Sequence, residues 1–266
     1  LGAVIASASA DVFIKDVVVT SQTEITSQKS PAGSLVGNHS GTLSVEIAEI
    51  NASVTHGGNG ASLGGIAGEI SGASGFLSVT DARIAATLTC LPGQNCRTGM
   101  IAGNIQATSQ DSSFRNVLIN GAIVAPDDPD IGTIYGYVMS GTPPSMNTIN
   151  GLSTVVSNAG RVSPNDVTDG RHEVTIPISV TDAEARQSQT YTDRGWGVYM
   201  GSDLWKAAPS DGWAMVEGEY PYLIRPADRV PPPGGGGSGS DGGTGGDDAS
   251  GGEVVLAAPS VSSPVV

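Results

Sequence analysis

The sequence predicts an all-β fold, a β-solenoid (parallel β-helix) of about five 31–35-residue coils followed by an aromatic C-terminal capping segment. Three observations predict it: a glycine-centred block recurs, an apolar ladder follows each block in the same phase, and the composition favours strands and tight turns. Charged residues make up only 14% of the chain and aromatics 5%, whereas glycine contributes 38 residues. Helical proteins usually carry more Leu, Lys and Glu than this.

The repeat is defined by five short blocks: LGAVIA at 1–6, AGSLVG at 32–37, LGGIAG at 63–68, TGMIAG at 98–103 and IGTIYG at 131–136. Steps of 31, 31, 35 and 33 residues separate their shared glycines, which are Gly2, Gly33, Gly64, Gly99 and Gly132. A second glycine closes all blocks but the first, at Gly37, Gly68, Gly103 and Gly136. Such glycines fit corners that need either a positive φ or a close backbone approach.

The first block decides how the N-terminal stretch is interpreted. LGAVIASASADVFIKDV resembles the tail of a secretory signal, but a signal also needs a basic n-region, and none is present. LGAVIA is instead in register with the four later blocks. We therefore expect residues 1–10 to belong to the fold and the chain to be a fragment that starts at a repeat boundary.

An apolar ladder confirms the phase of the repeat. Its sets are Ile14/Val19, Val45/Ile50/Val54, Val79/Ile84/Leu88, Phe114/Ile119/Ile123 and Leu152/Val156. Thr23 and Asn147 occupy two positions where an apolar residue is expected, and both fall in terminal repeats, which are usually atypical. Stacked coils about 4.8 Å apart would bury these columns in one core.

These blocks resemble the GLUG repeat (Gly-x-large aliphatic-x-Gly) of bacterial surface proteins such as filamentous-haemagglutinin-like adhesins. The resemblance covers roughly residues 1–156 and is carried by Gly33–Gly37, Gly64–Gly68, Gly99–Gly103 and Gly132–Gly136. The first copy departs from the pattern, with Ala6 in place of the second glycine. The resemblance implies a β-solenoid on an exported protein, and it implies no catalytic residues.

The two cysteines, Cys90 and Cys96, flank a Pro-Gly pair in the stretch CLPGQNC. A turn at Pro-Gly would bring the two ends of this stretch together. We therefore predict a disulfide, and with it an oxidising compartment. Two free thiols are the alternative, whereas a metal site is disfavoured because no His or second Cys pair lies at ligand spacing.

The composition changes after the repeats. We expect residues 157–226 to hold a final coil and an aromatic capping segment, because all three tryptophans and four of the six tyrosines fall between 191 and 222. This segment resembles the aromatic stretch that often closes GLUG arrays. Its aromatics either cover an open end of the solenoid or form a platform for sugar rings. The residues that would contact a glycan are Trp196, Tyr199, Trp205 and Trp213.

The composition of the last 40 residues predicts a spacer followed by a tail. Residues 227–252 form a Pro/Gly-rich acidic linker, too poor in apolar side chains to bury a core. Residues 253–266 are apolar enough to begin a further module. Asp247 and Asp248 among glycines resemble calcium-binding repeats, but the nonapeptide period of those repeats is missing. We therefore expect no cofactor.

No catalytic arrangement emerges from the sequence. Stacking places equivalent repeat positions in one column, and the most polar column holds Asp16, Ile47, Asp81, Asn116 and Ile149. We interpret it as a solvated face or an Asn/Asp turn in preference to a catalytic pair. The three histidines, which share no repeat position, are His39, His56 and His172. Nucleophile-elbow and phosphate-loop motifs are absent. We predict that the chain is not an enzyme.

Net charge and hydropathy limit the classes of partner that the chain is expected to bind. A formal net charge of −14 disfavours nucleic acid and anionic membranes, and no apolar run is long enough to span a bilayer. We predict a non-catalytic extracellular or cell-surface module, structural or adhesive, that presents loops to a host or neighbouring cell, a glycan or a matrix protein. Two alternatives stay open: a polysaccharide-binding or polysaccharide-cleaving β-helix, and a self-assembling filament or surface-layer subunit.

Overall fold

The computed structural model describes residues 2–72, 76–106, 112–124, 130–139, 149–153, 161–162, 178–200 and 212–224. The chain divides into two units, 1–229 and 230–266. The second unit lies outside the described residues, as does the whole of the predicted linker and tail at 227–252 and 253–266. All described residues belong to the first unit.

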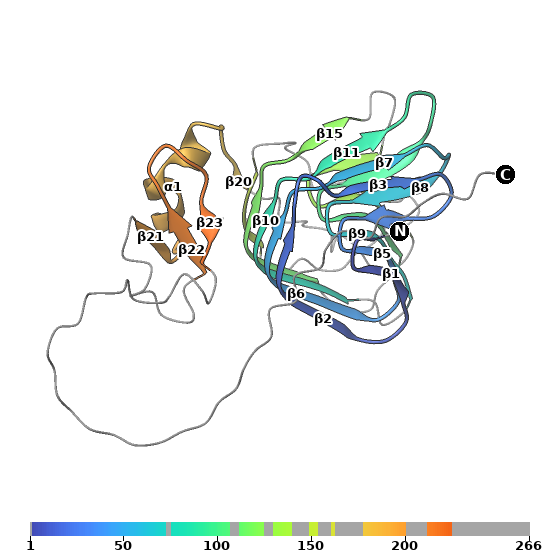
Figure 1. Cartoon of the computed structure of the whole chain (residues 1–266), viewed down its shortest axis with the longest axis horizontal. Coiled ribbons are helices and arrows are strands. Elements are labelled where there is room, and N and C mark those ends of the chain that lie inside the picture. The colour runs from blue at the N-terminus through green and yellow to red at the C-terminus, as the bar shows by residue number, and fades with distance from the viewer. Residues whose placement is uncertain are drawn as a thin grey trace, which may run out of the picture. The chain divides into compact units, whose positions relative to one another are not determined.

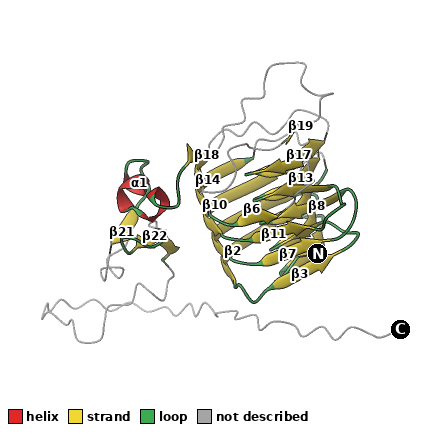
Figure 2. Cartoon of the chain, turned by 90° about the horizontal axis from the view of Figure 1, so that it is seen from above, coloured by secondary structure: helices red, strands yellow, loops and turns green. Residues whose placement is uncertain are grey.

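Each of the first four coils contributes one strand to each of four parallel sheets (Figures 1 and 2). The first coil consists of β1 (Ile5–Ala8), β2 (Val12–Val19), β3 (Glu24–Ser27) and β4 (Ala32–Gly33). The second consists of β5 (Val36–His39), β6 (Thr42–Ile50), β7 (Ser53–His56) and β8 (Ala61–Gly64). The third consists of β9 (Ala67–Ile70), β10 (Phe76–Ile84), β11 (Thr87–Cys90) and β12 (Cys96–Gly99). The fourth consists of β13 (Ala102–Gln106), β14 (Ser113–Ile119), β15 (Ala122–Val124) and β16 (Asp130–Gly132).

We name the sheets A to D in the order in which each coil visits them. Sheets A and B have the strand orders β1-β5-β9-β13-β17-β19 and β2-β6-β10-β14-β18-β20. Sheets C and D have the orders β15-β11-β7-β3 and β16-β12-β8-β4. The additional strands of A and B are β17 (Tyr135–Met139), β18 (Ile149–Ser153), β19 (Arg161–Val162) and β20 (Ile178–Ser179). The predicted β-solenoid is therefore confirmed, with four coils described in all four sheets and two further coils, β17 with β18 and β19 with β20, described only in sheets A and B.

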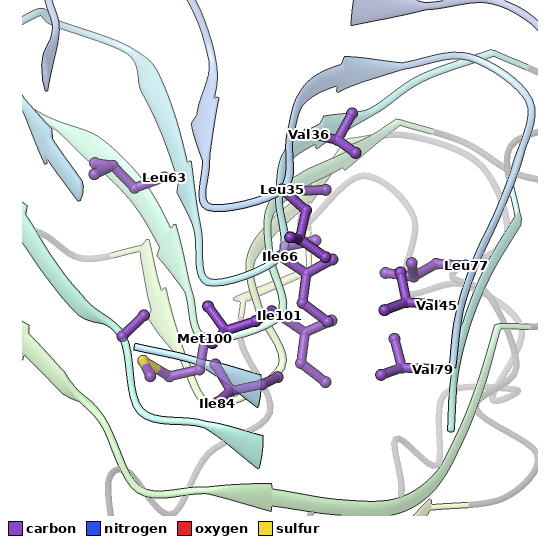
Figure 3. Close-up of a cluster of buried hydrophobic side chains, with 14 of the residues drawn as sticks. Leu35, Val36, Val45, Leu63, Ile66, Leu77, Val79, Ile84, Met100 and Ile101 are labelled. Carbon is purple, nitrogen blue, oxygen red and sulfur yellow. The ribbon is translucent and has the colours of Figure 1, made fainter. Parts of the chain in front are cut away.

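The core is a stack of like residues, as the apolar ladder predicts. Sheet B pairs Ile14, Val45, Val79 and Phe114 in one column and Val19, Ile50, Ile84 and Ile119 in another. Leu35, Ile66 and Ile101 form a further column at the corner between sheets D and A (Figure 3). Burial of each such aliphatic side chain stabilises the fold by about 1.5–3 kcal/mol, so the columns supply the main driving force for stacking.

Two register predictions were wrong in the terminal coils. In the first coil Val54 pairs with Ile25 and not with Thr23. The corner before β3 is two residues longer than the corner before β7 in the second coil. In the fifth coil Phe114 pairs with Ile149, and Leu118, not Ile119, pairs with Leu152. The segment from Gly132 to Ile149 is two residues longer than that from Gly99 to Phe114, and the register irregularity between Arg115 and Val117 compensates for one of the two.

The repeat glycines lie at the corner between sheets D and A because two backbones meet there. A Cβ on Gly33 would lie 2.3 Å from the carbonyl oxygen of Val36, and one on Gly99 would lie 2.2 Å from that of Ala102. A Cβ on Gly68 would lie 2.4 Å from the amide nitrogen of Ala32. The glycines at positive φ are others: Gly60, Gly72, Gly93, Gly195 and Gly218. Close approach therefore explains the motif, and a left-handed conformation does not.

The long strands of sheet B each contain one left-handed residue. These residues are Asp16, Ile47, Asp81 and Asn116, with φ between 51° and 56°. Asp and Asn tolerate this conformation, whereas a β-branched Ile does so only under strain. Four members of the predicted polar column thus share a backbone role, which bends the strand. The fifth was assigned wrongly, because Ile149 pairs with Phe114 and is not equivalent to Asn116.

The corner between sheets C and D is fastened differently in successive coils. The predicted disulfide is confirmed: Cys90 and Cys96 are bonded, with their Cα atoms 6.1 Å apart. At the position of Cys90 the second coil has His56, whose Nδ1 accepts from the Gly58 amide at 2.9 Å. The first coil has Ser27 there, whose hydroxyl donates to the Ser30 carbonyl at 2.7 Å. Three different side chains, one in each coil, thus hold the chain together at this corner.

Candidate functional site

After the solenoid the chain folds into a small unit that we call the aromatic module, residues 180–200 and 212–224. It comprises a 3-10 helix (Glu184–Arg186), α1 (Ser188–Thr192), β21 (Val198–Met200), β22 (Trp213–Met215) and β23 (Tyr222–Leu223). A capping box starts the helices: Thr181 Oγ1 accepts from the Glu184 amide at 3.1 Å, and Glu184 Oε2 accepts from the Thr181 amide at 2.8 Å.

Aromatic rings that contact one another at a tilt form the core of the module. Tyr191 and Trp196 have ring centroids 5.2 Å apart, as do Trp196 and Trp213. The hydroxyl of Tyr191 donates to the Ala185 carbonyl at 2.6 Å, and burial raises the pKa of this hydroxyl. Each polar atom of the cluster thus needs a partner inside the protein, and Trp213 finds its partner on the solenoid.

The module docks on the outer face of sheet B. Trp213 Nε1 donates to Asp81 Oδ1 at 3.2 Å, and Asn116 Nδ2 donates to the same oxygen at 2.8 Å. The apolar contact is made by Leu118, which is completely buried, and by the half-buried Ile47. At the rim, Arg83 lies 5.2 Å from the ring centroid of Tyr220. The left-handed bend therefore aims Asp81, Asn116 and Ile47 at the module.

This docking changes three sequence interpretations. The aromatic segment was expected to cover an open end of the solenoid, but its described contacts lie on β6, β10 and β14, inside sheet B. It packs on a side of the solenoid. Asp81 is only 8% exposed, so the solvated-face interpretation is wrong for it, whereas the Asn/Asp turn is correct. Asp81 serves docking, and its hydrogen-bonded Oδ1 is not open to a substrate.

The predicted glycan platform is also corrected. Trp196 and Trp213 are 3% and 1% exposed, so neither indole face is open to a sugar ring. Tyr199 is half-buried and packs against Ala214 and Ile224. Trp205 lies outside the described residues. The described tryptophans that the sequence suggests as a glycan platform are the core of the module.

A different surface meets the requirements of a binding face. On the outer side of sheet C, hydroxyl side chains stack from coil to coil in two columns; we call this the hydroxyl face and define it by Thr26, Ser53, Thr55, Thr87 and Thr89. Among the described residues these side chains make no hydrogen bond to a partner. The signal was present in the sequence, since hydroxyl residues flank the core residues Val54 and Leu88.

The outer faces of the other long sheets differ in this respect. On sheet B, Lys15 pairs with Glu46 at 3.3 Å, and the hydroxyls of Ser78 and Ser113 lie 3.1 Å apart. On sheet A, Gln106 Nε2 donates to Glu69 Oε1 at 2.9 Å. Polar groups there satisfy one another across neighbouring coils. The hydroxyl face differs in that none of its five hydroxyl side chains bonds a side chain of a neighbouring coil within the described residues.

Within the described ranges, no group of three or more His, Cys, Asp or Glu side chains is placed to hold a metal ion. In the same part of the chain, no helix is long and apolar enough to cross a bilayer.

Buried histidines make the fold sensitive to mild acid. His39 and His56 are both fully buried, and burial lowers the pKa of each from 6.5. In His56 the hydrogen bond that Nδ1 accepts from the Gly58 amide needs a neutral ring, whereas the bond of Nε2 to the Ser30 carbonyl, 3.0 Å long, raises the pKa and offsets burial in part. For His39, the nearby Asp11 carboxylate offsets burial only in part. The third histidine, His172, lies outside the described residues.

We expect the melting temperature to fall as the pH drops below about 6.5. The unfolded chain then binds protons that the folded chain excludes, so stability is full above that pH and is lost progressively towards the lowered folded pKa values. Paired carboxylates such as Asp11 and Asp182 have lowered pKa values, so their protonation reduces the stability of the fold only below about pH 4. Thermal melts between pH 7.5 and 5 therefore isolate the histidines; a His39→Gln/His56→Gln double variant that kept the full pH-dependence would contradict this.

Comparison of the chain with protein-family models, with curated proteins and with solved structures finds no match. The fold and the hydroxyl face therefore supply the physical basis for assigning a function.

Proposed function

We propose that the chain is a non-catalytic, extracellular structural and adhesive module of a bacterial surface or secreted protein, as the GLUG-repeat resemblance implies. The observation that carries the proposal is the hydroxyl face. Its two columns repeat at the spacing of the coils, about 4.8 Å along the stack, and present hydroxyl and methyl groups on a flat sheet. Such a face suits attachment to an extended hydroxylated partner, which we take to be a glycan.

Two further features support an extracellular setting. The disulfide between Cys90 and Cys96 is a bond that persists in oxidising compartments. The stacked coils form a continuous core from Ile14 to Ile134, which suits a rigid stalk that presents its side faces. Asp81, the best carboxylate for a polysaccharide-cleaving β-helix, is occupied by Trp213 and Asn116, so we favour binding over cleavage.

A glycan and matrix-protein binding array with the intact chain tests the proposal. We expect selective glycan binding that a Thr55→Lys/Thr89→Lys variant reduces at least tenfold, because the longer side chains disrupt the flat face. Ser44→Lys, on the outer side of sheet B, is the matched control and should leave binding unchanged. An array with no binding to any glycan or matrix protein would overturn the adhesive role, as would equal loss in the control variant.

A further inference from the structure

The columns of the hydroxyl face run along the stack of coils. The strands β3, β7 and β11 lie side by side and in register (Figure 1), so Thr26 pairs with Thr55 and Thr55 with Thr89. Neighbouring coils set equivalent side chains about 4.8 Å apart, whereas the two columns lie about 6.6 Å apart, the distance between alternate residues of one strand. The face therefore offers its shorter repeat to a ligand that lies along the stack.

The two columns present methyl and hydroxyl groups with very little charge. In the four coils that the structure describes on sheet C, Glu24 is the only ionisable residue of the two columns. The columns continue in the fourth coil as Ala122 and Val124, and Val124 is 50% exposed. The whole chain carries a net charge of −14, so anionic polymers are repelled. The face is complementary to an uncharged ligand.

A sugar ring with equatorial hydroxyl groups fits this combination of side-chain groups. Its flat faces carry C–H groups, and their contact with threonine methyl groups removes apolar surface from water. Its hydroxyl groups lie at the ring edges, where they meet threonine hydroxyls that can both donate and accept a hydrogen bond. In an extended β-1,4-linked chain such sugars follow one another at a spacing close to that of the coils. The chain would thus remain in phase with the columns over several sugars.

We propose that the hydroxyl face binds an uncharged, β-1,4-linked glycan chain that lies along the stack, with one sugar on each coil. The inference rests on the proposed function and adds the class of glycan and its direction. Thr26, Thr55 and Thr89 bond one edge of three successive sugars through their hydroxyl groups. Ser53 and Thr87, in the other column, bond the opposite edge of two of them.

Nuclear magnetic resonance titration of the intact chain with oligosaccharides tests the class of ligand. We expect the affinity for β-1,4-linked glucose to rise with each added sugar from one to three, because each sugar reaches one further coil. The α-1,4-linked trisaccharide, whose chain curves away from a straight column, should bind at least tenfold more weakly. The β-1,4-linked trisaccharide with its C6 groups oxidised to carboxylates should also bind at least tenfold more weakly, because the chain repels it.

Threonine-to-valine variants test the direction, because valine keeps the shape of the side chain and removes only the hydroxyl group. Thr55→Val, in the middle coil, should weaken binding of the disaccharide and of the trisaccharide about two- to tenfold. Thr89→Val should weaken binding of the trisaccharide alone, because a disaccharide still reaches both Thr26 and Thr55. Thr80→Val, on the outer side of sheet B, is the matched control and should change neither affinity. Circular dichroism checks that each variant is folded.

The possible failures of this inference differ from those of the proposed function. An equal loss for the disaccharide and the trisaccharide in Thr89→Val would mean that the ligand crosses the strands, which overturns the inference, as would unchanged binding in Thr55→Val. A chain that binds only anionic glycans, α-linked glycans or matrix proteins on the array would also overturn it and leave the adhesive role standing. An array without any binding would overturn both.

Discussion

Replacing Gly64 with alanine is expected to destabilise the solenoid by about 4 kcal/mol or more, enough to unfold much of the chain at room temperature. A Cβ at this position would lie 1.7 Å from the carbonyl oxygen of Ala67 and 3.0 Å from that of Ile101. The first atom belongs to the same corner and the second to the next coil. Since both are backbone atoms of packed strands, neither can yield without shifting a coil.

The matched control is Gly60→Asn. Gly60 has a φ of 72°, and a Cβ built there meets nothing within 4 Å. Asn tolerates this conformation, so we expect a loss below about 1 kcal/mol. Urea unfolding followed by far-ultraviolet circular dichroism measures both variants. Equal losses at the two positions would show that close backbone approach is not what the repeat glycine provides.

The repeat was predictable because the same residue pattern recurs in successive coils. Gly33, Gly64 and Gly99 precede Val45, Val79 and Phe114 by 12, 15 and 15 residues, and one stacking geometry satisfies all of them. Sequence alone left two explanations for the glycines, positive φ and close approach, since both exclude a side chain. Only the positions of the neighbouring carbonyl groups decide between them.

Errors arose where the repeat is irregular. The corner before β3 holds two extra residues, so the predicted ladder placed Thr23 where Ile25 lies. The segment before β18 also holds two extra residues, of which the irregularity beside β14 compensates for one, so Leu152 is shifted by one position. Ile47 could be assigned to the left-handed column only by alignment, because its residue type argues against that conformation.

The docking of the aromatic module was beyond sequence reasoning. Asp81 and Trp213 are 132 residues apart, and no periodicity relates them. The density of aromatics correctly indicated a packed unit, but an end and a side of a solenoid both offer apolar surface. A strained Ile47 beside a buried Asp81 marks the docking side, and backbone strain is visible only in the structure.

Replacing Trp213 with alanine is expected to cost about 3–5 kcal/mol in the stability of the aromatic module. The ring is 1% exposed, packs at a tilt against Trp196 and donates a hydrogen bond to Asp81. Its removal therefore leaves a cavity at the centre of the contact between the module and sheet B. The solenoid columns form a separate core cluster and should survive. Tryptophan fluorescence reports the module, because the two tryptophans that the structure describes, Trp196 and Trp213, lie in it, whereas far-ultraviolet circular dichroism reports mainly the solenoid.

Two further variants separate packing from hydrogen bonding at this contact. Trp213→Phe keeps an aromatic ring but removes the donor to Asp81, so we expect a loss of about 1–3 kcal/mol. Val216→Ala, next to β22 and 53% exposed, should change stability by less than about 0.5 kcal/mol. In Trp213→Ala the fluorescence transition, followed through Trp196, should move to lower urea while the circular dichroism transition stays. If both transitions moved together, the module and the solenoid would form one cooperative unit, and the aromatic module would be part of what holds the coils in place.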